Sequence, residues 1–224
     1  MPRLAAALAL ALAALAGCNP TITGDGVLGE QDFTVGPFTG VHVGLGIEAT
    51  VTAGASPQSV RLLGDENVLP FIGVTVSGNV LTTTLHDTGS VTSQHPLQLV
   101  VAVPSLDAVT ADGVAASSGV QTLVTASGVA APSLAVAATG GGQVVVAGAG
   151  GSAETVTLSG GATYDGSAYP AAAAAVDLSG GSQARLEVSG VVSGNVSGQS
   201  AVLVSGGGLC TATVGAGSSC APAP

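Results

Sequence analysis

The sequence predicts an all-β fold built as a parallel β-helix, or β-solenoid, and three observations carry this prediction. Apolar and polar residues alternate along many short segments, turn glycines recur at nearly regular intervals, and no long helical pattern separates the segments. Only 7% of the 224 residues are charged and 2% are aromatic, whereas 35 are Gly. Such a composition suits small side chains packed inside stacked coils, with Gly where the turns need a positive φ.

The chain begins with the pattern of an export signal. Arg3 precedes an apolar run of 13 residues from Leu4 to Ala16, shorter than the ~20 that a membrane-spanning helix needs. The run leads into Leu15-Ala16-Gly17-Cys18, which resembles the lipobox of bacterial lipoproteins. We therefore expect cleavage before Cys18 and lipidation of its thiol; an ordinary secretory signal with an incidental cysteine is the alternative.

The residue after Cys18 indicates a destination. Asn19 follows the cysteine rather than Asp, which by resemblance to the sorting rule of Gram-negative lipoproteins favours outer-membrane delivery. Stable anchoring takes two or more acyl chains, and a triacylated N-terminus supplies them. We predict a bacterial cell-envelope protein, lipid-anchored in the outer membrane, whose folded part faces either the periplasm or the cell surface.

The scarcity of basic residues excludes several function classes. The formal net charge is −10, and removal of Arg3 with the signal makes it −11. The mature chain has no Lys and only Arg61 and Arg185, so it lacks the basic footprint of a nucleic-acid-binding protein. It cannot use a lysine nucleophile or Schiff base. The same shortage argues against β-helix enzymes that cleave uronate polymers with clustered Arg and Lys.

The exported chain divides into three parts by its patterning. After the signal at residues 1–17, residues 18–32 are polar, Gly-rich and aperiodic, which predicts a flexible tether. Period-two alternation begins at Phe33, and we expect a single domain over residues 33–220 with a more irregular N-terminal β region, followed by a tail at 221–224. Within that region Gly64–Pro70 predicts a short helical turn, with acidic residues first and Pro as its stop.

A repeat of short strands and small-residue turns starts near Val109. Two clear copies are VTLSGGATYDG from Val156 and VDLSGGSQARLEV from Val176. The turn glycines Gly160, Gly180, Gly198 and Gly215 are spaced by 20, 18 and 17 residues. Periods near twenty without helices predict coils that stack to bury a shared core. A Gly/Ala/Ser low-complexity tract and an antiparallel β-sandwich are the two alternatives.

One long segment resembles a known family. The segment from Phe38, FTGVHVGLGIEATVTAGASPQSVRLLGDENVLPFI, is similar to the start of the bacterial domain described as a "putative auto-transporter adhesin head", or GIN, domain. The resemblance runs through Val103–Leu106 and the SGG-type coils to Cys220, covering roughly residues 33–220. The family's acronym, GIN, suggests Asn at the third position, whereas this chain has Glu48 in Gly46-Ile47-Glu48. The resemblance implies a right-handed parallel β-helix-like fold and an envelope location, and it brings no catalytic residues.

The few histidines and acidic clusters give no catalytic or metal site. His86-Asp87 and His95 would be the nearest approach to a metal cluster or an acid–base pair, but their turn-like polar context favours a solvated loop. His42 lies between two valines and is expected to point outward. Asp65-Glu66-Asn67 is the densest set of oxygen ligands, and a structural cap for the adjoining turn is preferred to a calcium site.

Two further features concern contact and stability. The segment from Tyr164 to Pro170, which holds Asp165 and Tyr169, is expected to leave a coil corner as a loop and to offer a contact surface. Cys210 and Cys220 remain once Cys18 is lipidated, and an even pair in an oxidising envelope predicts a disulfide that caps the last coil. Two free buried thiols are the alternative.

These features together predict a non-enzymatic envelope lipoprotein without cofactors. It would be held to the membrane by its lipid and would present a β-solenoid surface for adhesion or envelope interaction, with a surface glycan or a protein as ligand. A structural or assembly-support role in the periplasm is the first alternative. A glycan-active β-helix enzyme is the second, and it would need an inward cleft lined by carboxylates.

Overall fold

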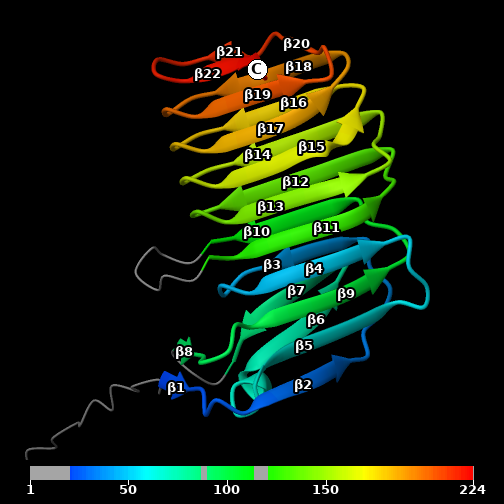
Figure 1. The fold of residues 1–224 in the computed structure, drawn as a ribbon, viewed down its shortest axis with the longest axis vertical. Coiled ribbons are helices and arrows are strands. Elements are labelled where there is room, and N and C mark those ends of the chain that lie inside the picture. Colours follow the sequence, from blue (N-terminus) through cyan, green and yellow to red (C-terminus); the bar gives the residue numbers. More distant parts are fainter. Residues whose placement is uncertain (1–20, 87–89, 114–120, 224) are drawn as a thin grey trace, which may run out of the picture.

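The computed structural model describes residues 21–86, 90–113 and 121–223, which are almost entirely strands and turns (Figure 1). Within these ranges the strands form two ten-stranded sheets and one small two-stranded sheet. The all-β prediction is confirmed.

Sheet 1 consists, in spatial order, of β2 (Leu28–Phe33), β5 (Ser59–Asp65), β9 (Gln98–Val103), β4 (Glu48–Ala53), β11 (Leu123–Val129), β13 (Gln143–Gly148), β15 (Thr163–Ala171), β17 (Gln183–Val188), β19 (Ala201–Ser205) and β22 (Ser219–Pro222). Sheet 2 consists of β20 (Leu209–Cys210), β18 (Val191–Val196), β16 (Ala174–Leu178), β14 (Ala153–Leu158), β12 (Ser133–Thr139), β10 (Ala108–Asp112), β3 (Gly40–Val43), β7 (Val80–Leu85) and β6 (Ile72–Ser77), with β21 (Thr213–Val214) also paired to β18. The small sheet pairs β1 (Thr21–Thr23) with β8 (Ser90–Thr92).

From β10 to β20 the chain alternates between the two sheets, and the strands from β10 to β18 each pair in parallel with the strand two places later; in the last layer β19 pairs in parallel with β22. The register advances by 20 residues from Gln143 to Thr163 and again to Gln183, then by 18 to Ala201. Two strands and two turns thus make one layer, and successive layers rise through the rainbow colours of Figure 1. Parallel pairing throughout this half excludes the antiparallel sandwich.

The N-terminal region is more irregular, as expected. The pairs β2–β5, β5–β9 and β6–β7 are antiparallel, whereas β3 and β4 pair in parallel with the strands of the later layers. The predicted helical turn is a single 3-10 turn, η1 (Leu69–Phe71), in which Pro70 lies inside the turn instead of ending it. Within the described ranges no helix is long and apolar enough to cross a membrane.

The core lies between the two sheets and consists of aliphatic side chains in rows along the stack. Alternate residues are buried along most strands of the stack, as in β17 and β14. Val109, Val136, Val156 and Val176 occupy matching register positions and form one such row in sheet 2. Burying each of these side chains contributes about 1.5–3 kcal/mol. Because the period is two, a slip of one residue would expose the whole row.

The predicted turn glycines allow the layers to approach closely. Gly160, Gly180 and Gly198 have φ values of 66°, 66° and 63°, a left-handed conformation that side chains with a Cβ disfavour. A Cβ on Gly180 would lie 3.0 Å from the backbone nitrogen of Gly160, and one on Gly198 would lie 2.7 Å from that of Gly180. Gly215 does not continue this row, because the positive φ of the last turn is at Gly217.

Two of the expected boundaries are wrong. The expected tether at residues 18–32 includes most of β2, which forms a regular antiparallel pair with β5. Arg61 on β5 donates to Asp32 at 2.8 Å and pairs with Glu30 at 3.3 Å, so the polar residues that suggested a linker lie on the outer face of a paired strand. The expected tail also begins too early, since Ala221 and Pro222 belong to β22.

Candidate functional site

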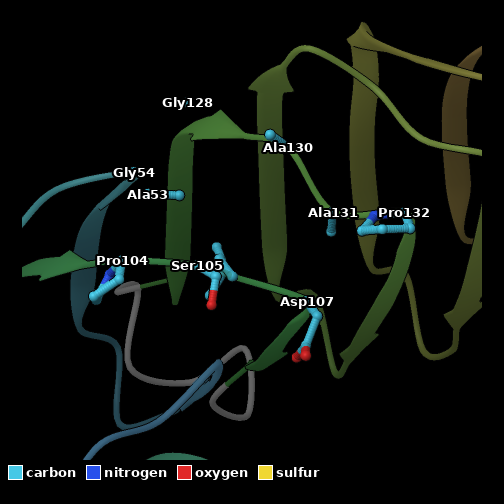
Figure 2. A pocket seen from close by; sticks show the side chains of 10 residues that line it. Ala53, Gly54, Pro104, Ser105, Asp107, Gly128, Ala130, Ala131 and Pro132 are labelled. Carbon is cyan, nitrogen blue, oxygen red and sulfur yellow. The ribbon is translucent and has the colours of Figure 1, made fainter.

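The candidate site is a shallow depression at one edge of the stack, where three strand-to-strand connections meet (Figure 2). It has a volume of about 270 Å³ and is lined by residues 53–54, 104–107, 128 and 130–132. These connections contain mainly Ala, Gly and Pro, which keep the turns small and leave the space open. Its volume lies just below the ~300 Å³ at which small-molecule sites usually begin.

Few polar groups reach this depression. Asp107 is the one charged residue of its lining, and Ser105 is nearby on the same connection. Both are exposed. No His, Cys, Lys or Arg lines the depression, so the lining offers Asp107 no acid–base partner. The depression fits a contact surface better than a reaction centre.

Behind the depression lies a buried cluster of one carboxyl group and two phenols. Glu154 on β14 is 1% exposed, and the Tyr164 hydroxyl donates a hydrogen bond to its Oε1. The other oxygen, Oε2, is buried without a hydrogen-bond partner among the described residues. Tyr169 donates its hydroxyl to the carbonyl oxygen of Ala131 at 2.8 Å, and Ala131 lines the depression.

Burial changes the acidity of all three groups. Desolvation raises the pKa of Glu154 from 4.5 to about 7, although the hydrogen bond from Tyr164 opposes this shift. The pKa of Tyr164 is raised by burial and then by the adjacent Glu154 carboxylate, and the pKa of Tyr169 is raised for the same two reasons. A carboxyl group with a pKa near neutrality is unusual, and among the described residues Glu154 is the one carboxyl group whose pKa is raised.

The expected contact loop is wrong, because Tyr164 and Tyr169 are core residues. They lie in the nine-residue strand β15 and are 2% and 0% exposed. The register with β17 skips from Gly166 to Pro170, a β-bulge that turns Tyr169 inward as well as Tyr164. Gly166 supplies space for the first ring, since a Cβ there would lie 2.4 Å from the Tyr164 hydroxyl oxygen. Asp165 faces outward and accepts hydrogen bonds from the backbone and side chain of Ser167.

Two histidine–carboxylate pairs join parts of the chain that are far apart in sequence. His95 Nδ1 lies 2.6 Å from Asp65, whose side chain is fully buried, and His42 Nε2 lies 2.6 Å from Asp112. The partners are separated by 30 and 70 residues, so no local motif reveals them. Within the described ranges, no three His, Cys, Asp or Glu residues gather as a metal site would require.

The expectation that Asp65 and Asn67 cap the adjoining turn is wrong, because their side chains bond to other segments of the chain. Asp65 accepts a hydrogen bond from the backbone of Gln94 at 2.6 Å in addition to that of His95. Burial favours a higher pKa for Asp65, but the bonds from His95 and Gln94 outweigh it and lower the pKa below 3.8. Asn67 bonds to Asp25 and Thr23 of the N-terminal segment. These side chains therefore fasten separate segments of the chain to the N-terminal end of the stack.

The two C-terminal cysteines form a disulfide between the sheets. Cys210 is on β20 in sheet 2 and Cys220 on β22 in sheet 1, with an S–S distance of 2.04 Å and a Cα–Cα distance of 6.3 Å. The bond joins the two sheets at the last layer. Cys18, the expected lipidation site, lies outside the described residues.

The outer face of sheet 1 carries both arginines of the mature chain in one register row. We call the outer surface of sheet 1 along this row the arginine face. The row consists of Asp32, Arg61, Val100, Thr50, Thr125, Val145, Asp165, Arg185, Leu203 and Ala221. The matching outer row of sheet 2 contains Asp177 and uncharged residues such as Thr157 and Asn195. The two faces therefore differ in charge pattern.

Solved structures share this fold at low sequence identity. An adhesin candidate from Bacteroides fragilis NCTC 9343, described as a "putative adhesin", aligns with a TM-score of 0.67 and 15% identity, covering 89% of this chain and 98% of its own. A "putative lipid binding protein" from Parabacteroides distasonis ATCC 8503 gives 0.54 and 10%, covering 92% and 100%. A "putative adhesin" from Parabacteroides merdae ATCC 43184 gives 0.52 and 12%, covering 91% and 99%.

Sequence comparison gives the family more directly. No curated protein matches this chain. The profile of the family described as "putative auto-transporter adhesin, head GIN domain" matches residues 37–208, which include every layer from β3 to β19. The match agrees with the resemblance found from Phe38 onward, and the chain belongs to this GIN-domain family.

Proposed function

We propose that the protein is a non-enzymatic envelope lipoprotein whose right-handed parallel β-solenoid presents the arginine face to an adhesion partner. The lipid on Cys18 would hold it in the outer membrane. The observation that carries this proposal is the direction of the stack: the described chain enters at the β1–β2 end and finishes at the opposite end (Figure 1). A lipid attached before β1 would thus leave the C-terminal layers, β18 to β22, at the end farthest from the membrane.

The dimensions of the stack support a role in display. Ten strands of one sheet at ~4.8 Å spacing extend about 43 Å along the stack. The buried rows and the closing disulfide keep this length rigid without any helix. A rigid support with small turns holds its outer residues at fixed spacing, which favours recognition of an extended partner by many weak contacts.

The arginine face is the preferred contact surface because its row holds Arg61 and Arg185 and, with Asp32 and Asp165, is neutral overall, whereas the chain as a whole is acidic. The mature chain carries a net charge near −11, so most of its surface repels the anionic groups common on cell surfaces. Arg61 pairs with Glu30 and Asp32, whereas Arg185 is exposed in the distal half of the row, makes no ion pair with another described residue and has Asp165 as its neighbour in register. Exposed Val100 and Val145, 44% and 37% accessible, lie in the same row and add apolar contact area. Arginine at such a surface binds carboxylate or sulfate groups of a glycan or protein.

The test compares one residue on each face. The mature protein, Arg185→Gln and Asp177→Asn are applied to an array of immobilised glycans and matrix proteins. We expect Arg185→Gln to weaken binding roughly 5- to 30-fold, as loss of one charge-assisted contact does. Asp177→Asn, the matched change on the outer face of sheet 2, is expected to leave binding unchanged. Equal effects of both variants, or none from Arg185→Gln on a bound partner, would contradict the assignment of the arginine face.

A further inference from the structure

Glu154 is an acidic residue in a position that otherwise belongs to the aliphatic core. It faces inward on β14, between Leu134 of β12 and Ala174 of β16 at the same register. Its side chain is 1% exposed, and only Oε1 receives a hydrogen bond, from Tyr164. Oε2 lies buried without a partner among the described residues. An ionised carboxylate in this place would leave one oxygen without solvent or donor, which is costly.

No opposite charge faces this carboxyl group from any packed strand. β12 and β13 carry no titratable residue, and they contribute Leu134, Val144 and Val146 to the core. β15 contributes the two phenols, while its Asp165 faces outward. The charged residues of the next layer, Asp177 on β16 and Arg185 and Glu187 on β17, alternate with buried residues and also lie on the outer faces. Glu154 is therefore well accommodated only in its neutral form.

We propose that Glu154 is a pH-responsive joint in the stack: the β14–β15 layer is closed while the carboxyl group is protonated and opens locally when the proton is lost to water. The layers on either side keep their own aliphatic rows and stay closed. Opening would reach the edge depression as well, because Tyr169 of the same layer donates its hydroxyl to Ala131 in the lining.

The direction of the pH dependence follows from the two protonation states. In the closed layer the pKa of Glu154 is raised to about 7 by burial, and in the open layer it returns to about 4.5. A raised pKa means that the closed layer binds the proton more tightly, so the closed form loses stability as pH rises from 4.5 to 7. The opening equilibrium should increase about tenfold per pH unit in this window and level off above it.

Hydrogen exchange of backbone amides, followed by mass spectrometry on the full mature chain, tests this joint. Exchange rates at pH 5 and pH 8 are corrected for the intrinsic pH dependence of amide exchange. For wild-type protein we expect protection of β14–β16 peptides to fall on the order of 70-fold between these pH values. Peptides from β4 and β9, which carry no buried acid, serve as the internal reference and should keep their protection.

Three variants decide the origin of the effect. Glu154→Gln keeps the shape and an acceptor for Tyr164 but cannot ionise, so its β14–β16 protection should not change with pH. Tyr164→Phe removes the hydrogen-bond donor that favours the carboxylate, so the pH at which β14–β16 protection is half lost should rise. Glu187→Gln, the same change at an outer position of β17, should behave as wild type.

The proposal is overturned if wild-type protection is independent of pH, or if Glu154→Gln retains the wild-type pH dependence. It is also overturned if Tyr164→Phe lowers the pH at which β14–β16 protection is half lost.

Discussion

Asp65 shows how single polar side chains fasten the irregular N-terminal end of the stack. Its carboxylate is fully buried, yet it accepts hydrogen bonds from the His95 ring and from the Gln94 backbone. These bonds join the end of β5 to the segment that leads into β9. Charge-assisted hydrogen bonds of this kind are stronger than neutral ones, and a buried side chain at position 65 that loses them is costly.

Asp65→Asn is therefore expected to destabilise the protein at neutral pH. The pKa of Asp65 is lowered on folding, so its carboxylate adds stability above pH 3.8, and this stability disappears as pH falls through the lower folded-state value. The gap in unfolding midpoint between wild type and Asp65→Asn should thus be largest near pH 7 and narrow toward pH 3. Urea unfolding at several pH values measures it. Asp177→Asn, an exposed carboxyl of β16, is the control and should show no gap; a gap for Asp65→Asn that widened on acidification would contradict the assignment.

At the scale of the strand and turn, backbone proximity between layers decides which glycines are essential. Gly194 on β18 has a φ of 118°, and a Cβ there would lie 2.0 Å from the carbonyl oxygen of Val176 on β16. Gly181 also has a positive φ, 79°, but a Cβ there would meet no atom within 4 Å. The two positions separate the cost of backbone conformation from the cost of contact between strands.

Gly194→Ala should be more damaging than Gly181→Ala. We expect Gly181→Ala to cost about 1–2 kcal/mol, the penalty for a left-handed residue with a Cβ. Gly194→Ala adds a clash with backbone that cannot move without breaking the β16–β18 ladder, so roughly 3–4 kcal/mol is expected. Denaturant unfolding of both variants measures the difference. Equal losses would mean that the strands are not in the parallel register described.

At the last layer, where no further layer packs against the stack, the Cys210–Cys220 disulfide holds the two sheets together. The loop that it closes spans 10 residues, for which the chain-entropy relation gives about 2–3 kcal/mol. The double variant Cys210→Ser/Cys220→Ser should lose that stability and should show faster hydrogen exchange in β20–β22. Exchange in β12–β14 should stay as in wild type. Unchanged exchange in β20–β22 would show that the last layer does not depend on the bond.

For the whole molecule, the sequence predicts the repeating half well and the ends poorly. The alternation around Val156 and Val176 and the spacing of Gly160, Gly180 and Gly198 are local patterns, and each layer repeats them. The role of β2 depends instead on contacts of Arg61 with residues about 30 positions away. No local pattern carries such information, so the sequence predicts a tether where the structure has a paired strand.

The buried cluster was beyond sequence reasoning for a similar reason. Tyr164 continues the inward row of Val144 and Ala184, a clue that the strand period alone provides. Tyr169 is turned inward by a β-bulge that no sequence pattern indicates, so the sequence predicts a loop where the structure has a strand. Glu154 shares an alternation with Val156 and Leu158, which predicts its burial, but its partner Tyr164 becomes visible only when the layers are stacked.

Labelling of intact cells tests the central claim, a membrane-anchored stack displayed at the cell surface, most directly. An antibody to the β20–β22 end is applied to intact cells and to cells with a permeabilised outer membrane, for wild type and for Cys18→Ser. The account predicts that intact wild-type cells label as strongly as permeabilised ones, and that Cys18→Ser releases the protein from the membrane fraction and abolishes labelling. Labelling only after permeabilisation would contradict surface display and support the periplasmic role, while retention of Cys18→Ser in the membrane would contradict the lipid anchor.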